Sequence, residues 1–126
     1  VLMALLPEGH KYKEQLERLA ARIAVNRTVA GVHFPVDSAA GRLLGTALAG
    51  YFVARCKGAK ALPLWGFNGP GFHGPKGAPI DFDMRVSMTD NRSDYYEHKD
   101  TRNSIPKSAI LHYMWTKAAK EWLPLK

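Results

Sequence analysis

The segment NRTVAGVHFPVD, from Asn26 to Asp37, lies between two long stretches of helical periodicity. Within it, Arg27 lies six residues before His33, and Asp37 lies four residues after that histidine. A guanidinium offers a rigid fork of donors for phosphate-like oxygens. An imidazole can attack or ligate the central atom, and a carboxylate can accept the other ring N–H and fix the tautomer. The three side chains are therefore candidates for holding a tetrahedral oxyanion.

The sequence on either side of this segment predicts two helices. Over 11–25, Tyr12, Leu16, Leu19 and Ile23 recur at helical spacing and form one apolar stripe. Over 35–56, the first residue is a proline, which suits a first helical turn. The segment between the helices is then a sharp connection that carries the histidine.

The second predicted helix has small residues along one ridge. Gly41, Gly45 and Ala49 follow one another at intervals of four residues. Glycine lowers helix stability, whereas small side chains allow another helix to approach closely. We therefore expect a buried central helix of a bundle, and a groove for a partner helix is the weaker alternative.

The rest of the chain changes character after the second helix. Residues 57–105 are expected to be irregular, because glycine and proline alternate between Gly66 and Pro79. The exceptions are a weak strand signal over Ile80–Met88 and a polar, solvated loop from Asp90 to Arg102. A last helix is expected over 106–122.

These elements predict an all-α fold: part of one helical bundle spanning 1–126, with a long Gly/Pro-rich irregular segment. Residues 11–56 would be the motif-bearing helices of this domain. The first residues, Val1 to Leu6, are apolar on every face, which suits the end of a buried helix. We therefore expect the chain to be the C-terminal part of a longer protein.

Composition narrows the classes of partner. The chain has 126 residues and a formal net charge of +7, yet its basic residues form no run of five and no zinc-finger or RNP-like motif appears. Nucleic-acid binding is therefore not favoured. The longest apolar run, Leu43 to Ala54, is too short to span a bilayer. Cys56 is the single cysteine, and we expect it to be a buried thiol.

The other histidines are interpreted as surface or packing residues. His10 ends the run Pro7-Glu8-Gly9-His10 and is expected on a loop. His98 lies near carboxylates, but at no standard metal-ligand spacing. His112 falls on the last predicted helix, and His73, between Phe72 and Gly74, is a weak candidate for lining the mouth of a site.

The segment from Asn26 to Asp37 resembles the third signature motif of the type 2 phosphatidate phosphatase and vanadium haloperoxidase superfamily. That motif is usually Ser-Arg-x5-His-x3-Asp, and here Asn26 stands where serine is usual. The Gly-Val-His-Phe-Pro core also resembles the family's Gly-x-His-Trp/Tyr-Pro run. The resemblance covers residues 1–56 and is to the soluble, acid-phosphatase-like branch. The family's first motif is absent from this chain, and Pro7-Glu8-Gly9-His10 looks like a damaged copy of its second, Pro-Ser-Gly-His.

The resemblance implies a phosphohydrolase that cleaves phosphate esters through a histidine nucleophile, without a cofactor. His33 would attack phosphorus, Asp37 would orient the imidazole, and Arg27 would bind the non-bridging oxygens. The alternative within the superfamily is a vanadium-dependent haloperoxidase, in which His33 would ligate vanadate. The partners would be a small phosphorylated substrate, or halide and peroxide, together with the N-terminal part of the protein that carries the other motifs.

Two readings from other classes stay open. One is a non-catalytic helical binding domain, and the other is an anion- or nucleic-acid-binding module that uses the positive charge. A homo-oligomer is compatible with the small-residue ridge. The sequence leaves localisation open, and the soluble branch is compatible with a periplasmic or secreted protein.

Overall fold

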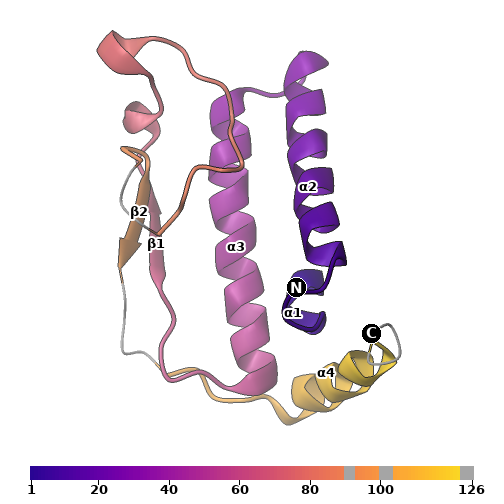
Figure 1. Ribbon diagram of the computed structural model, residues 1–126. Coiled ribbons are helices and arrows are strands. Elements are labelled where there is room, and N and C mark those ends of the chain that lie inside the picture. Colours follow the sequence, from indigo (N-terminus) through magenta and orange to yellow (C-terminus); the bar gives the residue numbers. More distant parts are fainter. Residues whose placement is uncertain (90–92, 100–103, 123–126) are drawn as a thin grey trace.

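The computed structural model describes residues 1–89, 93–99 and 104–122. Its elements are α1 (Leu2–Leu5), α2 (Tyr12–Val29), α3 (Pro35–Lys57), β1 (Leu64–Phe67), the 3-10 turns Gly69–Gly71 and Pro75–Gly77, β2 (Tyr96–Lys99) and α4 (Ala109–Glu121). The long helices α2 and α3 run side by side in opposite directions. The two strands lie beyond α3, and α4 crosses the foot of the molecule (Figure 1).

The connection between α2 and α3 is a tight, capped turn. Gly31 has a positive φ of 70° and ends α2. Its N–H donates to the carbonyl of Thr28 at 2.9 Å, and the Val32 N–H donates to the carbonyl of Arg27 at 3.2 Å. These bonds form a Schellman motif, which satisfies the last carbonyls of the helix. The turn therefore brings the chain back beside the end of α2 within a few residues.

The core lies between α3 and the strands. β1 pairs with β2 in antiparallel register, with Trp65 opposite His98. Tyr96 is buried, and its hydroxyl donates to the carbonyl of Ala39 on α3 at 3.1 Å. Ala39 is fully buried beneath the cluster that contains Tyr96, and its small side chain leaves room for the tyrosine ring. The buried cluster consists of Ala39, Met88, Tyr95 and Tyr96.

The predicted all-α fold is wrong, because the two strands make the chain a mixed α/β protein. Residues 64–67 were expected to be irregular, but Trp65 and Phe67 have the alternation that a strand needs. Residues 96–99 were expected in a solvated loop, yet Tyr96 is buried against α3. The pairing is non-local, so neither four-residue strand carries enough local signal to be recognised alone.

The weak strand signal over Ile80–Met88 is also wrong, since this segment has neither helix nor strand. The three long helices are confirmed with small shifts of their ends, at Tyr12–Val29, Pro35–Lys57 and Ala109–Glu121. Within the described residues, every helix falls short of the length and apolarity that a bilayer span requires.

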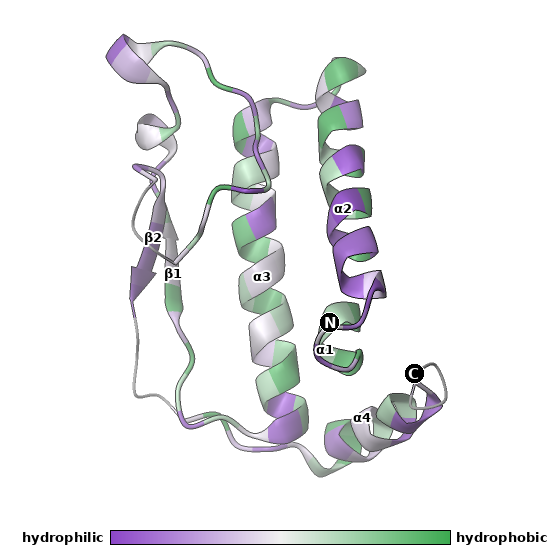
Figure 2. Ribbon diagram, viewed as in Figure 1, coloured by the Kyte–Doolittle hydropathy of each residue, from purple (hydrophilic) through white to green (hydrophobic). Residues whose placement is uncertain are grey.

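Much of the apolar surface predicted to be core is open. On α2, no residue is buried, and Leu19 and Ile23 are 53% and 55% exposed. On α3, a Cβ added at Gly41 or Gly45 would meet no other atom within 4 Å. The expectation that α3 is a buried central helix therefore holds only for the face toward the strands. Figure 2 shows hydrophobic residues, in green, distributed along α3, whereas much of α2 is hydrophilic.

Candidate functional site

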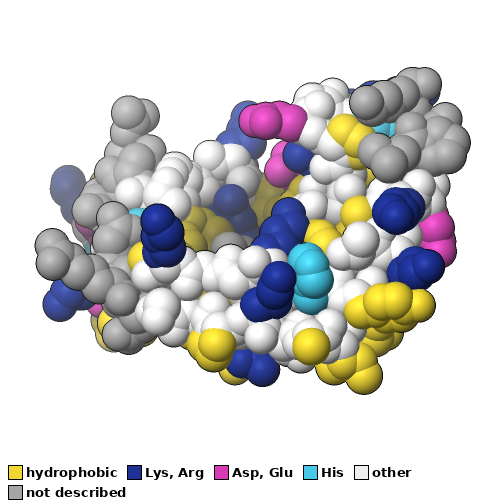
Figure 3. Space-filling view, turned by 90° about the horizontal axis from the view of Figure 1, so that it is seen from below, with side chains coloured by type: hydrophobic (Ala, Val, Ile, Leu, Met, Phe, Trp, Pro, Cys, Tyr) yellow, Lys and Arg dark blue, Asp and Glu magenta, His cyan; other side chains and the backbone are white. Residues whose placement is uncertain are grey.

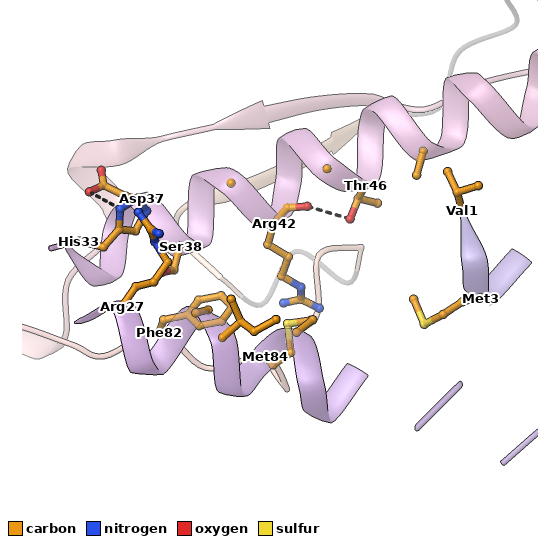
Figure 4. A pocket seen from close by; sticks show the side chains of 16 residues that line it. Val1, Met3, Arg27, His33, Asp37, Ser38, Arg42, Thr46, Phe82 and Met84 are labelled. Atoms are coloured by element: carbon orange, nitrogen blue, oxygen red, sulfur yellow. Dashed lines mark hydrogen bonds and ion pairs between the residues drawn. The ribbon is translucent and has the colours of Figure 1, made fainter. Parts of the chain in front are cut away.

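The three predicted site residues come from three successive parts of the helical hairpin. Arg27 lies in the last turn of α2, His33 lies in the connection, and Asp37 lies in the first turn of α3. All three line one cavity of about 600 Å³ between the helices. Figure 4 shows them gathered at one end of it. The Schellman turn fixes this arrangement, because the Arg27 carbonyl is bonded to the residue that precedes the histidine.

The histidine and the carboxylate are close, but they are not hydrogen-bonded. The distance from Nδ1 of His33 to Oδ2 of Asp37 is 4.0 Å, which is longer than the hydrogen bond that the motif predicts. The same Oδ2 accepts the backbone N–H of Phe34 at 3.1 Å. The predicted hydrogen bond is therefore absent, the two groups lie at ion-pair distance, and the same carboxylate oxygen caps the start of α3. The side chains are 31% and 47% exposed, so both have room to move.

Arg27 is exposed at the rim of the cavity. Among the described residues, its guanidinium has neither a hydrogen-bond acceptor nor an ion-pair partner. A guanidinium and an imidazole on one cavity can both donate hydrogen bonds to the oxygens of an anion.

The cavity has lining residues that the motif did not identify. Ser38 and Arg42 follow Asp37 on the same side of α3. The Arg42 Nη1 donates to the carbonyl of Val86 at 2.7 Å, and its guanidinium lies 5.7 Å from the centre of the Tyr96 ring. In Figure 4 its side chain extends toward Met84, away from the imidazole. Arg42 therefore holds the loop that contains Val86 against α3. It lines the same cavity as Arg27, His33 and Asp37 only because of its position along the helix.

The remaining lining is mostly apolar. The open ridge of Gly41, Gly45 and Ala49 forms one wall, and Ala20, Ile23 and Ala24 of α2 contribute to another. Phe82 and Met84 reach in from the loop after the 3-10 turns. In the sequence, only helical periodicity indicates that the ridge residues lie on one face. No local signal indicates that the loop with Phe82 and Met84 lies next to this cavity.

The other histidines lie away from this cavity. Nδ1 of His112 lies 2.9 Å from the carbonyl of Cys56, so the packing interpretation of His112 agrees with its place at the α3–α4 junction. Cys56 is buried, as predicted. His73 is exposed and does not line the cavity, which removes it as a residue of the site mouth. The His98 ring lies 4.8 Å from Trp65, and the His10 ring lies 4.8 Å from Tyr12.

Comparison of the chain with protein-family models, with curated proteins and with solved structures finds no match.

Proposed function

We propose that this chain carries the histidine half of a phosphohydrolase site and cleaves phosphate esters through His33. The observation that supports the proposal is the position of Arg27, His33 and Asp37 on one cavity. Their order and spacing in the sequence resemble the third motif of the acid-phosphatase-like superfamily. The local turn gives a physical reason for that spacing, because it returns the chain beside the end of α2.

The chemistry follows from the orientation of the imidazole. Nδ1 is the nitrogen on the side of Asp37, so Nε2 is the nitrogen that would attack phosphorus. The phosphorus–nitrogen bond forms as the ester bond breaks, and the leaving alcohol takes a proton from water. Water then cleaves the phosphohistidine and releases phosphate. Positive charge on the ring during the first step would draw the carboxylate closer than 4.0 Å.

Arg27 would stabilise the transition state rather than the ground state alone. The negative charge on the non-bridging oxygens must be stabilised while the phosphoryl group moves from the ester oxygen to the His33 nitrogen, and again while it moves from that nitrogen to water. A guanidinium with no internal partner can turn its fork toward these oxygens without breaking another bond.

Vanadate fits the same donor set, since it is a tetrahedral oxyanion that a guanidinium and an imidazole can hold. When bound, it would supply the activation of peroxide for halide oxidation. The chain's own residues would have the same tasks in that case: His33 as the ligand, Arg27 as the donor to the oxygens and Asp37 as the orienting group.

The proposal is tested by titrating the chain with orthovanadate and with phosphate while the histidine ring resonances are followed by NMR. We expect the His33 resonances to shift in a saturable manner, and those of His73 to stay in place. Arg27→Ala should weaken binding on the order of 10- to 100-fold, the range for losing hydrogen bonds to a charged group. His73→Ala is the matched control.

Hydrolysis of p-nitrophenyl phosphate, assayed in parallel with bromide oxidation by peroxide and vanadate, distinguishes the two chemistries. His33→Ala should abolish whichever activity is present. Saturable anion binding that is unchanged in both His33→Ala and Arg27→Ala would contradict the site itself.

A further inference from the structure

Basic side chains gather at the junction of α3 and α4. The segments 55–64 and 104–121 contain one carboxylate, Glu121, against a much larger number of cations. We call these cations the basic end: Arg55, Lys57, Lys60, Lys107, Lys117 and Lys120. Because these cations come from two segments that meet at one end of the molecule, they give that end a positive potential.

Backbone contacts bring the two segments together. The Ser108 N–H donates to the carbonyl of Arg55 at 2.8 Å, and Ala59 pairs with Ile105 in an antiparallel bridge. The Nζ of Lys57 lies 5.0 Å from the ring of Trp115 on α4. Residues about fifty positions apart in sequence therefore meet at the α3–α4 junction. Figure 3 looks at the molecule from this end, where Lys and Arg side chains outnumber the acidic ones.

The outer face of α4 is apolar between these charges. Ile110, Tyr113 and Met114 are 69%, 62% and 59% exposed, and their spacing places them on one stripe of the helix. The helix packs inward through the buried Trp115, and Met114, at the edge of the stripe, also lines a pocket with Leu5 and Phe52. The Nζ of Lys117 lies 5.5 Å from the Tyr113 ring, so charge and apolar surface meet directly.

We propose that the basic end, with the exposed stripe of α4, docks on an anionic phospholipid surface. Lysines attract the negative headgroups, and each one near the surface contributes to binding. Ile110 and Met114 would enter the boundary between headgroups and acyl chains, while Tyr113 would lie at the headgroup level. A nucleic acid would use the cations but would gain little from exposed isoleucine and methionine side chains, so the apolar stripe favours the lipid.

Vesicle sedimentation with the whole chain tests this proposal. Vesicles of phosphatidylcholine alone are compared with a mixture of phosphatidylcholine and phosphatidylserine, at low and at high salt. We expect binding to the anionic mixture, strong weakening by salt, and little binding to the neutral vesicles. The variant Lys107→Gln/Lys117→Gln/Lys120→Gln should bind roughly 100-fold more weakly, because each lysine contributes about a fivefold share.

Two further variants separate the contributions to binding. The first tests the net charge of the chain, and the second tests the apolar stripe of α4. Arg22→Gln/Lys76→Gln removes two exposed cations elsewhere on the molecule and should leave binding within about threefold, since their charges lie farther from the surface. Ile110→Ser/Met114→Ser should weaken binding to anionic vesicles while the far-ultraviolet circular dichroism spectrum stays unchanged. These two side chains are exposed, so the fold does not depend on them.

Three results would overturn the proposal. The first is equal binding to neutral and anionic vesicles. The second is wild-type binding by the triple lysine variant. The third is tight binding to a fluorescent DNA duplex with no binding to either kind of vesicle, which would assign the basic end to nucleic acid.

Discussion

One carboxylate oxygen of Asp37 makes two contacts, a hydrogen bond at the start of α3 and an ion-pair contact with His33. Its Oδ2 accepts the Phe34 N–H at 3.1 Å and lies 4.0 Å from Nδ1 of His33. The first contact stabilises the start of α3, and the second places negative charge beside the imidazole. A change of charge on the ring would therefore shift the carboxylate between its two partners.

Replacement of Asp37 separates the two tasks. Asp37→Ala should lower the free energy of unfolding by about 1 kcal/mol, because the cap and the favourable charge at the helix start are both lost. Asp37→Asn keeps an oxygen acceptor and should cost less. Thermal unfolding followed by circular dichroism measures both, with the exposed Asp81→Ala as the control. Equal losses for alanine and asparagine would show that the oxygen does not cap the helix.

Tyr96 joins the strands to α3. Burial raises the pKa of its phenol above the ordinary value of 10.0, and the nearby Arg42 offsets part of that rise. Because the unfolded chain releases this proton at lower pH than the folded chain, the stabilisation is complete below about pH 10 and is lost as the pH rises above it.

Tyr96→Phe removes both the titrating group and its hydrogen bond to the Ala39 carbonyl. We expect a loss of about 1 kcal/mol at neutral pH and a shallower decline in stability above pH 10. Urea unfolding at a series of alkaline pH values measures the difference between the variant and the wild type. Parallel declines in the two proteins would contradict the burial of this phenol.

At the scale of elements, the 3-10 turn after β1 is a point of close approach. A Cβ built at Gly71 would lie 2.2 Å from the carbonyl oxygen of Asp94, whereas one at Gly69 would have 3.9 Å to its nearest neighbour. The backbone beside β1 therefore packs directly on the backbone that leads into β2. This contact helps to hold the two short strands in register, because neither strand is long enough to fix it alone.

Gly71→Ala should destabilise the chain by roughly 1–3 kcal/mol, the range for forcing atoms into a packed site. Gly69→Ala, two residues away in the same turn, should have little effect. Urea unfolding monitored by tryptophan fluorescence suits this pair, because Trp65 lies on β1. Equal stabilities of the two variants would mean that the strands do not pack as closely as described.

At the scale of the whole molecule, the described residues cover the helical hairpin on one side only. The strands pack on one face of α3, while its small-residue ridge lines the open cavity that also holds His33. Leu44, Leu48 and Tyr51 add exposed apolar surface to the same helix. Exposed patches of this kind mark places where another helix, a ligand or a second copy of the chain binds.

Gly45→Ala tests whether the ridge is open in solution. With nothing within 4 Å of the added methyl group, the variant should be more stable by about 0.5–1 kcal/mol, because alanine favours the helix. Thermal unfolding combined with analytical ultracentrifugation measures this effect. A loss of stability together with a smaller oligomer would instead show that another copy packs against the ridge.

The sequence by itself determined the three long helices, because apolar periodicity and Pro35 are local signals of where a helix runs and starts. Arg27, His33 and Asp37 were identified by their chemistry and their spacing, and the structure places all three on one cavity. The burial of Cys56 also followed from its apolar surroundings.

Only the tertiary structure decided the strands and the outer parts of the cavity. The pairing of Leu64–Phe67 with Tyr96–Lys99 depends on contacts between residues some thirty positions apart, and the burial of Tyr96 depends on the small Ala39 on a third element. The same holds for Phe82, which reaches the cavity from the loop that packs on α3, and for the bond from Arg42 of α3 to the Val86 carbonyl of that loop. Such neighbours are set by packing across the chain, which leaves no periodic or local mark in the sequence.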